Sequence, residues 1–122
     1  MIQVVNLNTY DGDDLAIISR PSPLGNPYCH KPSVFPWVQR VPTVEIAVDK
    51  YRTYIYNKIR RKDRVITYEL KLLLLYYNQK GSIALGCHCK DKHGEGLCHG
   101  DVIKEIMERY IQLTNSKKGN KC

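Results

Sequence analysis

The sequence lacks a long hydrophobic run and a secretory leader. Its longest apolar stretch, Leu72 to Tyr77, is far shorter than the roughly 20 residues of a membrane-spanning helix. The first residues, Met1 to Asn6, have neither the basic patch nor the apolar core and small-residue cleavage site of a signal peptide. We therefore expect a cytoplasmic protein that does not associate with membranes.

Acidic residues are scarce. The chain has 12 Asp and Glu against 19 Lys and Arg, which gives a net charge of +7. A surface with this excess of positive charge attracts anions. We expect an anionic small molecule as the partner, with nucleic acid or a host protein as alternatives, and the composition leaves the oligomeric state open.

The cysteines do not have the pattern of a secreted disulfide framework. There are five, an odd number, and three of them lie between Cys87 and Cys98. In a cytosolic protein, clustered cysteines and histidines indicate metal or thiol chemistry more often than disulfides. This cluster is therefore a candidate functional site.

Two segments near the start of the chain have the character of strands. Ile2 to Leu7 is rich in β-branched residues and alternates, and Leu15 to Ile18 is a second short apolar run. The turn-forming residues 11–14 separate the two segments. They are expected to form either a hairpin or neighbouring strands.

Helices and one further strand are predicted after residue 42. Thr43 and Asp63 are suitable N-caps, and each precedes apolar residues at steps of three and four. Gly81 ends the second helix, and Ser82 to Cys87 is expected to be a buried strand. The apolar face of a final helix is expected to consist of Val102, Ile103, Ile106, Tyr110 and Leu113.

This order of elements predicts a small, layered α/β fold. A short, partly parallel sheet would be covered by about three helices. The length of 122 residues and the 43% hydrophobic content suit one core, and the sequence has no internal repeat. We expect a single α/β domain over residues 1–115 and a basic, flexible tail over 116–122.

All six prolines lie between Arg20 and Pro42, which excludes regular helix from most of that segment. Within it, Arg20 to Pro27 combines prolines with a glycine and is expected to follow one rigid course. That course would hold Arg20, Ser22 and Asn26 as a preorganised polar group. The apolar residues of the wider segment predict an ordered loop that packs; they are Leu24, Tyr28, Val34, Phe35, Trp37 and Val38.

The cysteine and histidine cluster consists of Gly86-Cys87-His88-Cys89 and Cys98-His99-Gly100-Asp101. On a strand, Cys87 and Cys89 share one face. Cys98 and His99 fall at the start of the last helix, where unpaired N–H groups and the helix dipole favour a thiolate or a bound anion. Cys98 is therefore the most reactive thiol expected in the chain.

Several interpretations of this cluster remain open. The helix start at Gly100 and Asp101 would hold a phosphate or carboxylate, with Lys90 and Lys92 supplying charge. A thiolate would act as a nucleophile, with His88, His93 or His99 as its base. Zinc would be bound tetrahedrally by Cys87, Cys89, Cys98 and His99, although adjacent Cys98 and His99 do not easily face one ion. In the simplest interpretation, the cysteines are small buried apolar side chains.

A basic run from Lys58 to Arg64 joins the two predicted helices. Its central residues, Arg60, Arg61 and Lys62, would grip a phosphate backbone if the protein binds nucleic acid. The alternative is that this run is a solvated helix end.

The motifs R-P-S-P-L-G-N-P at 20–27 and G-C-x-C…C-H-G-D at 86–89 and 98–101 resemble an uncharacterised domain family of unknown function. That family is common in bacteriophages and bacteria, and the resemblance covers about residues 2–113. It implies a small intracellular, often phage-encoded protein in which both motifs form one site, without implying an activity. The glycine-rich segment 90–97 departs from the family, whose members have a shorter, proline-containing loop there.

These observations predict a domain that binds or processes a nucleotide-like or other phosphorylated small molecule, and they leave open whether it is an enzyme. The pocket is expected beyond the C-terminal end of the strand at 83–87. Cys98 and His99 are the catalytic candidates. The ligand-binding candidates are Arg20, Ser22, Gly25, Asn26, Cys87, Cys89, Gly100 and Asp101. The alternative is a zinc-stabilised module that binds nucleic acid or a host protein, and zinc is the only cofactor that any interpretation requires.

Overall fold

The computed structural model describes residues 1–88 and 96–119, with side chains up to Thr114. Within these residues the chain forms three helices and two parallel sheets. The elements are β1 (Ile2–Asn6), β2 (Leu15–Ile17), β3 (Tyr28–Cys29), β4 (Gln39–Arg40), α1 (Val44–Arg60), α2 (Arg64–Lys80), β5 (Ile83–Cys87) and α3 (His99–Gly119). None of the described helices is long and apolar enough to cross a membrane.

The larger sheet has the strand order β1-β5-β2, and both pairings are parallel. Asn6 of β1 is opposite Cys87, and Ile17 of β2 is opposite Gly86, so the three strands end at the same edge. Each residue of β5 is buried, as expected for an apolar run in the middle of a parallel sheet. The first two strands therefore form neither a hairpin nor a pair of neighbours, contrary to the prediction, because β5 lies between them.

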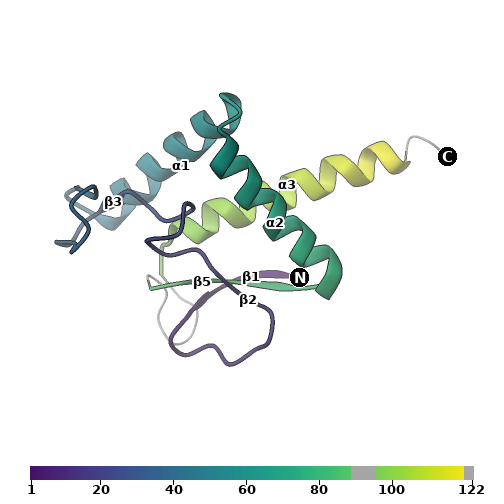
Figure 1. Cartoon of the computed structure of the whole chain (residues 1–122), viewed down its shortest axis with the longest axis horizontal. Coiled ribbons are helices and arrows are strands. Elements are labelled where there is room, and N and C mark those ends of the chain that lie inside the picture. Colours follow the sequence, from purple (N-terminus) through teal and green to yellow (C-terminus); the bar gives the residue numbers. More distant parts are fainter. Residues whose placement is uncertain (89–95, 120–122) are drawn as a thin grey trace.

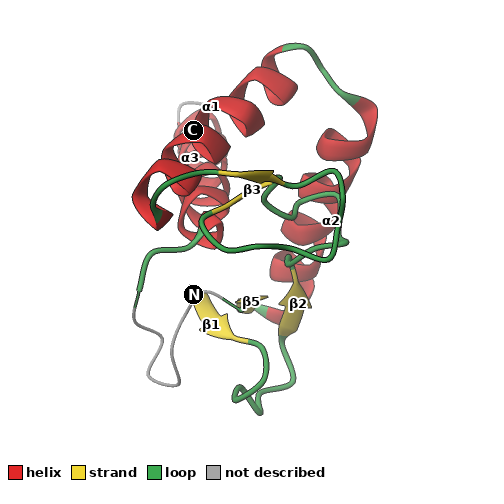
Figure 2. Ribbon diagram, turned by 90° about the vertical axis from the view of Figure 1, so that its left-hand side faces the viewer, coloured by secondary structure: helices red, strands yellow, loops and turns green. Residues whose placement is uncertain are grey.

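All three helices lie on the same side of this sheet in two perpendicular views (Figures 1 and 2). Helices α2 and α3 pack against its strands, and α1 packs against α2, α3 and β3. The buried side chains form one core, which includes Tyr51 and Ile55 of α1, Leu70 of α2 and Leu85 of β5. The structure is thus the small α/β fold with a short parallel sheet that the sequence predicts.

The helix ends follow from local capping. Thr43 Oγ1 accepts a hydrogen bond of 3.2 Å from Ile46 N–H, and Asp63 Oδ1 accepts one of 3.0 Å from Ile66 N–H. Gly81 takes a φ of 79°, which a residue without Cβ adopts at low cost, and its N–H donates to Tyr77 O. The predicted starts of α1 and α2 and the end of α2 are confirmed.

The buried face of α3 differs from the prediction. Val102 and Ile103 are buried as expected, but Tyr110 and Leu113 are 56% and 61% exposed, and Met107 is buried in the core. The last turns of α3 extend past the sheet and α2 (Figure 1), which accounts for the exposure of this part of its apolar face within the described residues. The helix continues to Gly119, into the predicted tail at 116–122, whose last three residues lie outside the described part.

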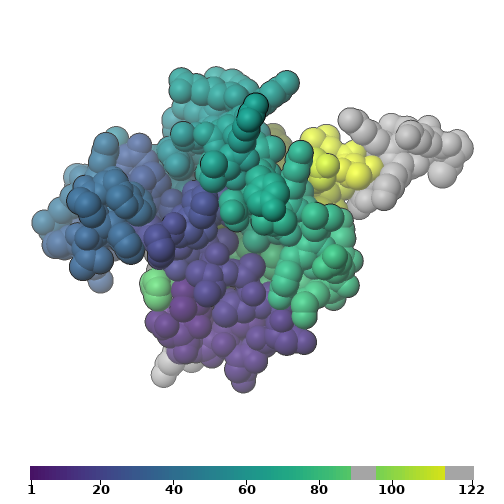
Figure 3. Space-filling view, in the orientation of Figure 1, coloured from purple at the N-terminus to yellow at the C-terminus, as the bar shows by residue number. Residues whose placement is uncertain are grey.

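The proline-rich segment contains no helix, as predicted, but only its first half packs closely. Leu24 is 1% exposed, whereas Val34 is 92% and Trp37 is 50% exposed. The residues around β3 and β4 form a lobe at the left of the space-filling view (Figure 3). The prediction that the whole loop packs is wrong for this second half, because the core lies beneath 18–26 and the lobe extends beyond it.

A buried carboxylate connects β2 to the start of β5. Asp14 is 6% exposed and accepts hydrogen bonds from the hydroxyls of Tyr10 and Ser82, the latter at 2.6 Å. Its carbonyl oxygen also accepts the N–H of Ala84 at 2.8 Å. The Ser82 hydrogen bond is the main cause that lowers the pKa of Asp14, and the Tyr10 hydrogen bond adds to it.

We predict that Asp14→Asn lowers the free energy of unfolding by about 1–3 kcal/mol at pH 7, because an amide oxygen replaces only one of the two acceptors. A carboxylate with a lowered pKa in the folded state stabilises above its unfolded value, near 4, and this contribution is lost as the pH falls further. Urea unfolding at pH 7 and pH 3 measures the difference, which should shrink at pH 3. Asp11→Asn, on the exposed turn, is the control, and equal effects of both variants at pH 7 would contradict the prediction.

Candidate functional site

The chain after β2, the chain after β5 and the first turn of α3 meet at one edge of the sheet. Parallel strands bring their carboxyl ends together, so Ser19 and Arg20 lie near His88. His99, the first residue of α3, joins them through a hydrogen bond to the carbonyl oxygen of Ile18. The two sequence motifs therefore converge at this edge.

His99 is held in one orientation. Its side chain is buried, and Nε2 donates to Ile18 O at 2.8 Å, because a carbonyl oxygen can only accept. The lone pair of the neutral ring is then on Nδ1, which lies 3.6 Å from Cys98 Sγ. Burial is the main cause that lowers the pKa of His99. The hydrogen bond to Ile18 raises this pKa, and the nearby charge of Arg20 lowers it. The imidazole is therefore neutral at pH 7.

Tyr51 connects His99 to the proline-rich segment. Its ring meets the His99 ring edge to face at a centroid distance of 5.0 Å, and its hydroxyl donates to Leu24 O at 2.7 Å. The residue is fully buried, and this burial raises the pKa of the phenol well above 10. Tyr51 therefore stays a neutral donor and fixes the turn at Leu24 beside His99.

The segment 20–27 is ordered by its own polar groups. Arg20 Nη1 donates to Asn26 O at 2.6 Å, and Asn26 Nδ2 donates to Ala47 O at 3.2 Å. The Asn26 side-chain oxygen accepts Tyr28 N–H, and Ser22 Oγ accepts Leu24 N–H. A Cβ on Gly25 would lie 2.8 Å from Arg20 N, so this close approach requires glycine.

A cavity of about 620 Å³ lies between this segment, α1 and His99. We call it the central pocket. Its wall contains two permanent cations, Arg20 and Lys31, and three imidazoles, while none of the described residues that line it is acidic. The lining residues are Ser19, Arg20, Asn26, Tyr28, Cys29, His30, Lys31, Pro32, Ser33, Phe35, Val44, Ala47, Val48, His88 and His99.

Three of the predicted ligand-binding and catalytic residues, Arg20, Asn26 and His99, line the central pocket, as does His88, which was a candidate base. Others support its walls: Ser22 and Gly25 shape the turn. Cys87 and Cys98 are completely buried and do not line the pocket. Cys89, together with Lys90, Lys92 and His93, lies outside the described residues.

Several lining residues were not singled out from the sequence. Tyr28, His30 and Lys31 directly follow the Arg20–Pro27 motif, and Phe35 comes soon after. The available signal was the concentration of aromatic, imidazole and cationic side chains in a segment expected to be ordered. The prolines indicated which residues shape the loop, but they did not indicate which side chains the loop places in the pocket.

The start of α3 uses its own N–H groups. Cys98 N–H donates to Asp101 Oδ2 at 3.1 Å, Gly100 N–H to Cys98 Sγ at 3.3 Å, and Asp101 N–H to Cys98 O at 3.0 Å. A Cβ on Gly100 would lie 2.7 Å from Val4 Cγ1, so Gly100 lets α3 approach β1. Gly100 and Asp101 therefore cap and pack this helix end, and the expected anion cradle stays a prediction.

Two alternative sites were predicted, a zinc site and a nucleic-acid contact. Within 1–88 and 96–119, no three His, Cys, Asp or Glu side chains are grouped to hold a metal ion, and the predicted zinc set includes Cys89, which is not described. Arg60, Arg61 and Lys62 are exposed at the junction of α1 and α2, and none of them lines the central pocket.

We predict that His99→Gln removes part of the acid sensitivity of folding. A histidine whose pKa is lowered by folding contributes stability that is lost as the pH falls below its unfolded value of about 6.5, by up to about 1.4 kcal/mol per pH unit. Glutamine keeps an N–H donor for Ile18 O but does not titrate. Urea unfolding from pH 7.5 to pH 5 should show the two proteins converging, with exposed His88→Gln as the control; parallel curves for wild type and His99→Gln would contradict this assignment.

Comparison with known proteins assigns the family but no activity. Searches of curated proteins and of solved structures found no match. A family model described as a domain of unknown function, DUF4326, matches residues 5–109, which include the proline-rich segment, both helices that follow it, β5 and the start of α3. The chain is therefore a member of the DUF4326 family.

Proposed function

We propose that this domain binds a small phosphorylated, nucleotide-like molecule in the central pocket. The observation that carries the proposal is the charge of the lining: the cations Arg20 and Lys31 line the cavity, and no described lining residue is acidic. Such a wall favours an anion over a neutral or cationic ligand.

The size and position of the pocket support this proposal. A volume of about 620 Å³ lies within the roughly 300–1,000 Å³ of small-molecule sites and suits a mononucleotide. Open α/β sheets bind ligands beyond the carboxyl ends of their parallel strands, and Ser19 and His88 line the pocket just after β2 and β5.

Arg20 is the principal candidate for binding phosphate. Its bond to Asn26 O orients the guanidinium, and no second hydrogen bond of this side chain occurs in the described part of the chain. The remaining N–H groups suit bidentate contact with phosphate oxygens. Lys31 supplies a second positive charge, and the rings of Tyr28 and Phe35 offer surfaces on which a base would stack.

We propose that the Cys98 and His99 pair shapes the wall of the central pocket and does not act in nucleophilic catalysis. The Cys98 thiol is buried outside the cavity lining, and the only N–H of neutral His99 is used by Ile18. His99 thus positions the wall beside Arg20, with its ring forming part of the cavity surface.

The prediction is that adenosine 5′-monophosphate stabilises the protein in thermal unfolding and that adenosine does not. Lys31→Ala should weaken the affinity for the monophosphate at least about tenfold, because a charge-assisted contact contributes roughly 1.5–3 kcal/mol and 1.4 kcal/mol corresponds to a factor of ten. Isothermal titration measures both affinities. Lys31 is exposed and its side chain makes no hydrogen bond in the described residues, so the fold should be unaffected.

Lys71→Ala, which removes an exposed lysine of α2, is the matched control and should bind the monophosphate as wild type does. Arg20→Lys should weaken binding as well, because an ammonium group lacks the fork geometry. Ribose 5-phosphate and inorganic phosphate show how much of the affinity comes from the phosphate alone. Failure of every phosphorylated compound to bind, or equal losses in Lys31→Ala and Lys71→Ala, would refute the proposal.

A further inference from the structure

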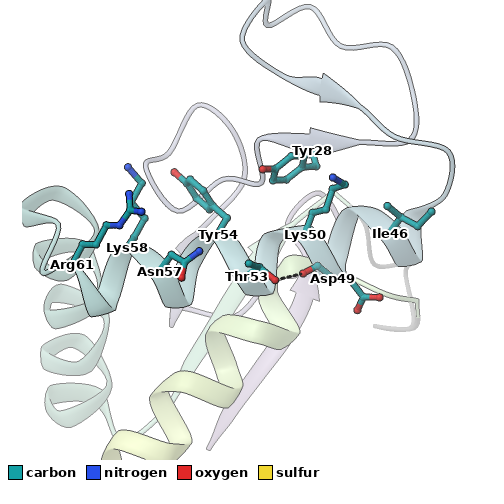
Figure 4. Close-up of a pocket in the computed structure, with 9 residues that line it drawn as sticks. All are labelled: Tyr28, Ile46, Asp49, Lys50, Thr53, Tyr54, Asn57, Lys58 and Arg61. Atoms are coloured by element: carbon teal, nitrogen blue, oxygen red, sulfur yellow. Dashed lines mark hydrogen bonds between the residues drawn. The ribbon is translucent and has the colours of Figure 1, made fainter.

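The outer face of α1 has a second cavity, of about 630 Å³, which we call the α1 groove. Eight of its lining residues come from α1 or its C-cap, and Tyr28 of β3 covers them from one side (Figure 4). The residues are Tyr28, Ile46, Asp49, Lys50, Thr53, Tyr54, Asn57, Lys58 and Arg61.

Cations follow the groove at helical spacing. Lys50, Lys58 and Arg61 span three turns of α1, roughly 16 Å at 1.5 Å per residue. Figure 4 shows Lys50 and Lys58 on the side of the helix where Tyr28 lies, whereas the Asp49 carboxylate points away from them. Lys58 is also 3.5 Å from Asp63 Oδ2, whereas Lys50 and Arg61 form no ion pair in the described residues. The lining thus has three cations and one carboxylate, that of Asp49.

Tyrosine rings lie beside these cations. Lys50 Nζ is 5.6 Å from the centroid of the Tyr28 ring, and Lys58 Nζ is 5.7 Å from that of Tyr54. A positively charged groove with aromatic rings at intervals is the arrangement by which proteins bind single strands, since the cations follow the phosphates and the bases stack on the rings. An acidic peptide without aromatic side chains would use the cations alone, because it brings no bases to stack on the rings.

The α1 groove and the central pocket share a wall. Tyr28 lines both cavities, and the segment that follows it, with His30 and Lys31, lines the central pocket. A strand that occupies both cavities would have to pass Tyr28. A mononucleotide would leave the groove empty, whereas a nucleotide within a strand would place its neighbours there.

We propose that the ligand is single-stranded nucleic acid, with one nucleotide in the central pocket and the phosphates of the adjoining nucleotides along Lys50, Lys58 and Arg61. This inference rests on the function proposed above and names its substrate class. It also gives a role to part of the basic run noted in the sequence: Arg61 lines the groove, and exposed Arg60 and Lys62 extend its positive end.

The experiment compares thymidine 5′-monophosphate with 5′-phosphorylated oligothymidylates of two to six nucleotides by isothermal titration. Affinity should rise at least tenfold from one to four nucleotides and then level off. Lys50→Ala/Arg61→Ala should reduce the oligonucleotide affinity toward that of the monophosphate and leave monophosphate binding unchanged. Removing two phosphate contacts should also reduce the slope of log affinity against log salt by about 1.4.

Lys71→Ala/Arg109→Ala is the matched control, because it removes one exposed lysine and one exposed arginine from α2 and α3 with the same loss of charge. It should bind oligonucleotides as wild type does. Both variants keep Lys58, which contacts the N-cap residue of α2, and circular dichroism verifies that each is folded.

The outcomes separate the two proposals. Equal affinity for the monophosphate and the oligonucleotides overturns this inference and leaves the mononucleotide site intact. Oligonucleotide binding that needs Lys50 and Arg61 but is insensitive to Lys31→Ala retains the groove and refutes the role of the central pocket. A poly-glutamate peptide that binds the groove as tightly as an oligonucleotide of equal charge also overturns the inference, as does binding of neither nucleotide form.

Discussion

The hydrogen bond from His99 to the carbonyl oxygen of Ile18 is the contact on which the site depends. It joins the end of β2 to the start of α3 across 81 residues of sequence. Tyr51 packs against the other side of the same imidazole and binds Leu24 through its hydroxyl. These buried contacts thus hold β2, α1, α3 and the proline-rich segment in fixed positions around the central pocket. The same burial keeps the His99 ring neutral.

The two motifs of the sequence act mainly as the frame of the pocket. The side-chain nitrogen and oxygen of Asn26 both form hydrogen bonds with backbone groups, and Gly25 lets the turn approach Arg20 closely. Gly100 and Asp101 do the same for the start of α3. Seven of the fifteen residues that line the pocket lie between Tyr28 and Phe35, outside both motifs. A distinctive motif therefore need not consist of the residues that meet a ligand.

Local signals in the sequence predicted most of the secondary structure. Capping by Thr43, Asp63 and Gly81 sets the helix ends through contacts within a few residues, so the helix positions were predictable. The strand order was not, because the place of β5 between β1 and β2 depends on partners more than 65 residues away. Helical spacing also could not show that α3 is longer than the surface it packs against. For this reason the exposure of Tyr110 and Leu113 was not predicted.

Contacts between segments that are distant in the sequence also limited the prediction of the candidate site. Residue types pointed to Arg20, Asn26 and His99, and these do line one cavity. Composition could not show that the N–H groups at the start of α3 are already used, or that the Cys98 thiol faces the core. Both depend on how the helix start sits against β1 and the Ile18 region. The sequence did not predict the α1 groove either, because Tyr28 lies beside α1 only as a result of the path that the proline-rich segment takes.

The strand order also constrains when the domain becomes complete during synthesis. The strand in the middle of the sheet is the last of the three to leave the ribosome, so the first two strands have no neighbour to pair with until residue 87 has emerged. Closing such long intervals makes folding slow relative to chains whose partners are adjacent in sequence. The residues before β5 must remain without this sheet until β5 has been made, and the edge that carries the central pocket is complete only after His99 has followed it.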